Sequence, residues 1–86
     1  MKVNLPTPLV EYTGGKRDVE ASGDTLAAIL HDLDRHYPGI RFRMVDEQEQ
    51  IRAHIKLFVN AELVRTLATP IAVTDSVMIV AALSGG

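Results

Sequence analysis

Few side chains in this 86-residue sequence could do chemistry on their own. Cysteine is absent, so disulfides, thiolate metal sites and cysteine nucleophiles are all excluded. There are three histidines, but His31 and His36 are five positions apart, which is about 140° around a helix. His54 has no acidic residue at ligand spacing. The pattern favours surface histidines over a metal site, and we expect no bound metal.

Motifs for independent catalysis are also missing. Gly-x-Ser-x-Gly, His-Glu-x-x-His and a complete Walker sequence do not occur, and spacing alone assembles no Ser, His and Asp constellation. Gly14-Gly15-Lys16 has part of a phosphate-loop pattern, but the earlier Gly and the following Ser or Thr are missing. Arg17, Arg35, Arg41 and Arg43 could form an anion patch, yet acidic residues surround them and indicate a mixed surface. We therefore expect a protein that is not itself an enzyme.

The last two residues, Gly85 and Gly86, offer a different chemistry. At a glycine usage of about 7%, such a pair would end roughly 0.5% of chains by chance. The plain alternative is a frayed end without a role. Residues without Cβ atoms can thread a narrow channel and present a bare carboxylate to another protein's active site. Attack of that carboxylate on the α-phosphate of ATP would give an acyl-adenylate, which a sulfur or amine nucleophile can capture.

Composition and charge place the chain among small globular proteins. Hydrophobic residues make up 47% and charged residues 23%, and the length fits one domain, residues 1–86. The net charge of −2 argues against nucleic acid as a partner. No stretch has the length of a signal-peptide core or of a membrane span, so we expect a cytoplasmic protein that does not enter membranes.

One amphipathic helix is the clearest element. Asp24 or Thr25 can cap its start, and Pro38-Gly39 ends it. Apolar residues between these limits recur with the period of a helix and form one stripe: Leu26, Ile29, Leu30, Leu33 and Tyr37. We expect this stripe to lie on a sheet.

The N-terminal part predicts two short strands, residues 2–5 and 17–21. Pro6 and Pro8 predict an irregular stretch after the first strand, because proline cannot donate to a ladder. Thr13-Gly14-Gly15-Lys16 predicts a tight hairpin turn before the second.

The C-terminal part predicts three more strands. Residues 54–59 alternate as a half-buried strand does, and Asn60-Ala61 forms a turn into residues 62–65. The apolar run 77–83 predicts a central strand, whereas the mixed charges of residues 40–52 predict a short helical turn and an exposed loop. The fold class is therefore α+β, with one helix across a mixed sheet.

Alternation also predicts two faces for that sheet. The expected core joins helix and strand residues: Leu26, Ile29, Leu30, Leu33, Ile55, Leu57, Val59, Val77 and Ile79. Phe58, Met78 and Val80 should then lie together on the outer face, flanked by Lys56 and Arg65. An exposed apolar cluster of this kind indicates a partner surface.

The chain resembles the ubiquitin-like sulfur carriers of the molybdopterin-synthase small subunit and thiamine sulfur-carrier type. The resemblance covers essentially the whole chain and rests on short motifs in a shared order: Thr13-Gly14-Gly15, Ala21-Ser22-Gly23-Asp24-Thr25-Leu26, Asp32-Leu33, Tyr37-Pro38-Gly39-Ile40, Val59-Asn60, Asp75-Ser76-Val77 and Gly85-Gly86. It is most similar to the carriers for cysteine or homocysteine synthesis. Thr74 stands where the family commonly has Gly, and Ala81 and Ala82 where prolines often precede the tail.

The resemblance implies a β-grasp (ubiquitin-like) fold of four to five strands, with the last strand central and residues 84–86 as a flexible tail. It implies that an E1-like enzyme uses ATP to adenylate Gly86, while Gly85 and Ser84 thread into that enzyme. The thiocarboxylate that follows then gives sulfur to an acceptor synthase, for cysteine or homocysteine, molybdopterin or the thiamine thiazole. No cofactor would be bound, and the carrier would be a monomer or part of a hetero-oligomer. The alternative is a ubiquitin-like modifier joined to lysines through Gly86, or a plain interaction domain.

Overall fold

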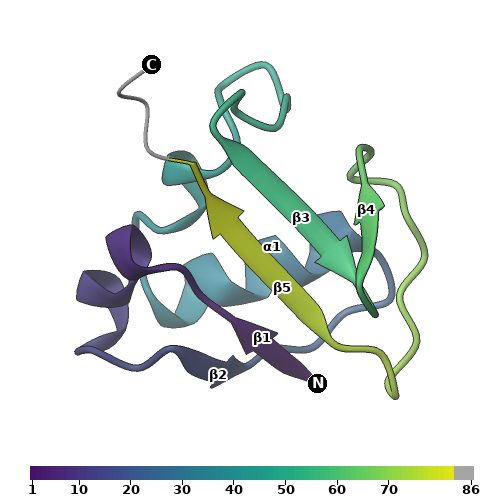
Figure 1. Ribbon diagram of the computed structural model, residues 1–86, viewed down its shortest axis with the longest axis horizontal. Helices are drawn as coiled ribbons and strands as arrows, with labels where there is room; N and C mark the ends of the chain where they lie inside the picture. Colours follow the sequence, from purple (N-terminus) through teal and green to yellow (C-terminus); the bar gives the residue numbers. More distant parts are fainter. Residues whose placement is uncertain (83–86) are drawn as a thin grey trace.

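The computed structural model describes residues 1–82, which form one mixed sheet crossed on one face by a helix (Figure 1). The strands are β1 (Lys2–Asn4), β2 (Asp18–Glu20), β3 (Ile55–Val59), β4 (Glu62–Val64) and β5 (Val77–Ala81), in the spatial order β2-β1-β5-β3-β4. The helices are α1 (Leu26–His36) and two 3-10 helices, η1 (Thr7–Thr13) and η2 (Arg41–Arg43). Within the described residues, no helix has the length and apolar content needed to cross a membrane. The α+β prediction is confirmed.

β5 lies in the middle of the sheet, as its apolar run predicts. It pairs parallel with β1, where Val3 lies opposite Val77, and antiparallel with β3 over five residue pairs from Ile55↔Ala81 to Val59↔Val77. A strand bonded along both edges is held more firmly than an edge strand. The last described strand therefore has a fixed position and direction.

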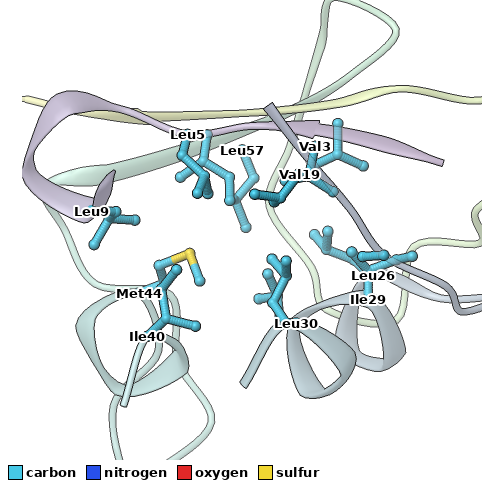
Figure 2. Packing of buried hydrophobic residues seen from close by; sticks show 14 of the residues in the cluster. Val3, Leu5, Leu9, Val19, Leu26, Ile29, Leu30, Ile40, Met44 and Leu57 are labelled. Atoms are coloured by element: carbon cyan, nitrogen blue, oxygen red, sulfur yellow. The ribbon is translucent and has the colours of Figure 1, made fainter. Parts of the chain in front are cut away.

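The helix α1 begins and ends close to the predicted limits. The Thr25 hydroxyl accepts a hydrogen bond from the amide of Ala28, which is the N-cap interaction expected for this residue type. Leu26, Ile29, Leu30 and Leu33 are fully buried, and Figure 2 shows the first three directed at Val3, Val19 and Leu57 on the sheet. The amphipathic stripe thus forms the helix side of the core.

Ile55, Leu57, Val77 and Ile79 are buried as predicted. Val59 is a partial exception, because it packs against the core but is only partly buried. It is the last residue of β3, at the turn, where the helix above the sheet gives less cover.

The connection between β1 and β2 corrects the predicted tight hairpin. The two strands pair antiparallel, with Val3 opposite Val19, but η1 separates them. Gly14 has a φ of 69° and caps η1, and its N–H donates to the carbonyl of Val10. Gly14 and Gly15 both have positive φ, as a tight turn requires, but they end a 3-10 helix that begins at two prolines and do not form a hairpin loop.

The segment after α1 corrects the prediction of an exposed loop. Ile40, Met44 and Val45 are fully buried, and Figure 2 shows Ile40 and Met44 closing the core beside Leu9 of η1. Their spacing fits neither a helix nor a strand, because η2 lasts only three residues before the chain turns. The short helical turn itself is confirmed.

Candidate functional site

The tail leaves the sheet at a well-defined point. After β5, the amide of Ala82 donates a hydrogen bond of 2.8 Å to the carbonyl of His54, directly before β3. Figure 1 shows this end of β5 at the opposite side of the molecule from the N-terminus. The predicted site residues Ser84, Gly85 and Gly86 lie outside the described residues. The structure fixes the origin from which they extend.

The outer face of the sheet carries a row of apolar side chains across three strands. Phe58 pairs with Leu63 of β4 on one side and with Met78 of β5 on the other. Met78, Leu63 and Val80 are 41%, 42% and 36% exposed. Phe58 is half-buried rather than exposed, because it lies between two neighbours of the row. The predicted outer-face cluster is confirmed as a structure, and Leu63 is the member that the sequence did not predict. Its signal was present, since a two-residue turn at Asn60-Ala61 pairs Val59 with Glu62 and therefore places Leu63 opposite Phe58.

Met78 lines two hollows. One, of about 490 Å³, is lined mainly by residues 4–8 and the end of β5 from Met78 to Ala81. The other, of about 340 Å³, is lined by residues that include Phe58, Ala61 and Met78. The apolar row is therefore bordered by depressions that partner side chains could fill.

Lys56 and Arg65 lie together, as predicted, at one side of this row. Both line a hollow of about 170 Å³ that also contains Leu63. Lys56 lies opposite Val80 of β5. Lys56 and Arg65 therefore border Phe58 and Leu63, each two residues away along the chain.

The four arginines considered as an anion patch do not act together. Arg35 pairs with Asp32 at 2.6 Å, and Arg41 pairs with Glu49 at 2.9 Å. Arg17 donates to the hydroxyl of Thr7. Arg43 instead lines a hollow of about 300 Å³ with Phe42, Arg52 and His54, a grouping that the sequence analysis missed.

The histidines are exposed, and residues 1–82 contain no group of three side chains that could hold a metal ion. His36 lies beside Asp32 on the helix surface, with its Nδ1 atom 2.9 Å from the Asp32 carbonyl oxygen. These positions agree with the interpretation of surface histidines.

Two carboxylates have lowered pKa values, and both hold loops rather than form a reactive site. The backbone N–H of Ser22 and then the side chain of Arg35 lower the pKa of Asp32. The backbone N–H of Ala72 and then the amide of Asn60 lower the pKa of Asp75. Hydrogen bonds to the charged form explain both shifts.

Comparison with known proteins identifies the family. Residues 3–86 match the model of the ThiS family. The chain belongs to the ThiS family. The "Sulfur carrier protein CysO" of Mycobacterium tuberculosis is 45% identical over 89 residues, covering 98% of this chain and 96% of that protein. This confirms the resemblance to the ubiquitin-like sulfur carriers.

Solved structures extend the similarity to the fold. The crystal structure of Mycobacterium tuberculosis CysO has a TM-score of 0.90 at 42% identity, covering 95% of this chain and 98% of that one. A chain in the crystal structure of the Amycolatopsis orientalis BexX/CysO complex has a TM-score of 0.91 at 36% identity, covering 99% and 98%. The small archaeal modifier protein 1 of Methanosarcina acetivorans has a TM-score of 0.81 at 26% identity, covering 99% and 94%. The fold of this ThiS-family chain is the predicted β-grasp.

Proposed function

We propose that this sulfur carrier of the ThiS family works through the carboxylate of Gly86, as a co-substrate of other enzymes. The observation that carries the proposal is a Gly-Gly pair, Gly85 and Gly86, three and four residues beyond Ala82, where the central strand β5 gives the tail a fixed origin. No cysteine exists to carry sulfur on a side chain. The similarity to proteins named sulfur carriers supports the same conclusion.

The chemistry proceeds in two balanced steps on an E1-like enzyme. A carboxylate oxygen of Gly86 attacks the α-phosphorus of ATP, the bond to the β-phosphate breaks, and pyrophosphate leaves. A hydrosulfide-level nucleophile then attacks the acyl carbon, AMP leaves, and one proton is released. The product is a thiocarboxylate, a sulfur nucleophile that an acceptor synthase consumes. The chain itself supplies the acyl group, the narrow tail and the surface that aligns them.

The outer-face row is the proposed docking surface for these partners. Met78 and Val80 lie on β5, which leads into the tail, and Phe58 lies on its neighbour β3, so a partner bound there is close to the point where the tail begins. A related CysO chain forms a complex with BexX, which supports the expectation that carriers of this type bind partner proteins. The resemblance favours a cysteine or homocysteine synthase as the acceptor.

A modifier function is the second candidate. It is favoured by the similarity to a small archaeal modifier protein, at 26% identity. Incubation with the activating enzyme, ATP and sulfide, followed by intact-mass measurement, separates the two. We expect the carrier to exchange one oxygen for one sulfur. Bonds to lysines of other proteins, without that exchange, would support the modifier instead.

A further inference from the structure

A basic hollow lies beside the point where the tail leaves the sheet. Arg43, Arg52 and His54 line it together with the ring of Phe42, which is 56% exposed. The carbonyl of His54 accepts the hydrogen bond from Ala82, so the hollow adjoins the last described residue before the tail. Arg43 and Arg52 are nine positions apart in the sequence, and only the fold brings them together.

The side chain of Arg52 is held in place. Its Nε atom donates to the carbonyl of Phe42 at 2.7 Å, and its guanidinium lies 4.5 Å from the centre of the Phe42 ring. Such an arrangement orients the two remaining guanidinium nitrogens without neutralising their charge. Arg52 is thus an oriented donor of hydrogen bonds.

No acidic side chain within residues 1–82 forms an ion pair with Arg43, Arg52 or His54. The nearby carboxylate of Glu49 pairs with Arg41 instead, and that of Asp46 accepts two backbone N–H bonds of its own loop. The net charge of the chain is −2, so this uncompensated basic hollow is a local exception. Its charge is available to an external anion.

We propose that Arg43 and Arg52, with His54 between them and Ala82, form a cationic collar beside the origin of the tail, and that its occupant is a set of carboxylate side chains on the protein that takes up the tail. The identity of that protein rests on the proposed function. The distance to the tail's end favours side chains over the phosphates of ATP. If the tail is extended in the active site of the activating enzyme, its four residues span about 13 Å, and the reacting carboxylate then lies beyond the reach of an arginine held at the sheet. The collar would therefore contact the rim of the channel that takes up the tail. There it would speed the association of the carrier with the partner protein and orient the two proteins.

The direct test is an NMR titration of the full ¹⁵N-labelled chain with a hexaglutamate peptide and, separately, with sodium pyrophosphate. At an ionic strength of about 0.01 M, we expect the peptide to shift the backbone amide resonances of residues 41–43 and 52–54. These shifts should disappear at about 1 M salt, where the Debye length is only about 3 Å. Pyrophosphate that shifts these amides while the peptide does not would identify a free-phosphate site and overturn the proposal. Absence of localised shifts with both probes would overturn it too.

Three variants give matched controls. In Arg43→Glu, whose side chain makes no hydrogen bond within residues 1–82, we expect at least a tenfold loss of peptide affinity with an unchanged thermal midpoint. Arg43→Lys keeps the charge and should retain most of the affinity. Lys2→Glu makes the same charge change beside the start of β5, at the other end of that strand from Ala82, and should have no effect. Equal losses in Arg43→Glu and Lys2→Glu would show only a net-charge effect and would contradict the collar.

The activating enzyme provides the second readout. We expect Arg43→Glu to lower kcat/KM for adenylation at least tenfold and to leave kcat at saturating carrier unchanged, because the collar acts in binding. An unchanged kcat/KM would contradict it. If the wild-type chain is not adenylated at all, the proposed function fails, whereas the peptide titration still decides whether the collar binds carboxylates.

Discussion

The amide of Asn60 donates a hydrogen bond of 2.7 Å to the carboxylate of Asp75, which joins the β3–β4 turn to the loop that leads into β5. The side-chain oxygen Oδ1 of Asn60 in turn accepts a hydrogen bond of 3.1 Å from the backbone N–H of Ser76. Asn60 and Ala61 have φ values of 50° and 72°, the conformation that a two-residue hairpin turn requires. One side chain thus fixes both a turn and the start of the strand that carries the tail.

Replacing Asn60 should therefore destabilise the fold. We expect Asn60→Ala to lower the free energy of unfolding by about 1–2 kcal/mol, because it removes two hydrogen bonds and leaves a positive φ on a residue that disfavours it. Asn60→Gly removes the same bonds but tolerates the φ, so its loss should be smaller. Urea unfolding measures both. Equal stability of wild type and Asn60→Ala would show that the hydrogen bonds of Asn60 to Asp75 and Ser76 contribute nothing to the free energy of unfolding.

Acid should weaken the same connections. The folded-state pKa values of Asp32 and Asp75 are lowered, so their contribution to stability is complete above the unfolded value of about 3.9 and is lost as pH falls below it. We expect the free energy of unfolding to fall with decreasing pH in this range, and the fall to be shallower in Asp75→Asn. If the free energy of unfolding falls equally steeply with decreasing pH in the wild type and in Asp75→Asn, Asp75 does not contribute to the acid sensitivity.

The core should be sensitive at Leu30, which is fully buried between α1 and the sheet. We expect Leu30→Ala to cost about 2–5 kcal/mol, a large part of the stability of a small domain. His31→Ala, on the exposed side of the same helix, is the matched control and should stay within about 0.5 kcal/mol. Thermal unfolding of the two variants gives the comparison. A midpoint for Leu30→Ala that equals that of wild type would show that the helix does not dock as described.

The helix and β3 could be predicted because their apolar residues repeat with a regular period, and β5 because it is a continuous apolar run. The stripe from Leu26 to Leu33 and the alternation from Ile55 to Val59 each record one buried face. Ile40, Met44 and Val45 are equally buried, but their burial could not be predicted from a periodic pattern. A 3-10 turn of three residues is too short to repeat, so the burial comes from tertiary packing alone.

The candidate site also has parts that could be predicted from the sequence and a part that could not. Gly85 and Gly86 are adjacent in the sequence, and the row of Phe58 and Met78 follows from alternation, so both could be predicted. The group of Arg43, Arg52 and His54 could not, because two segments, η2 and the residues directly before β3, meet there only in the folded chain.

Phe58 is the central member of the outer-face row, so we expect it to anchor partner binding. Phe58→Ala should weaken binding to the activating enzyme or the acceptor at least tenfold, as aromatic anchors often contribute more than about 2 kcal/mol. Because Phe58 is half-buried, Met78→Ala serves as a second variant with less effect on packing. Calorimetric titration measures both, with circular dichroism to confirm folding. Unchanged affinity of both variants for both partners would remove this face from the mechanism.

The carboxylate of Gly86 is the centre of the proposed mechanism, and intact-mass measurement tests it most directly. The wild-type chain, a chain without Gly86 and a chain extended by one residue after Gly86 are each incubated with the activating enzyme, ATP and sulfide. We predict that only the wild-type chain exchanges one oxygen for one sulfur, with all three chains folded alike by circular dichroism. Sulfur transfer to the extended chain, without removal of its added residue, would contradict the proposal.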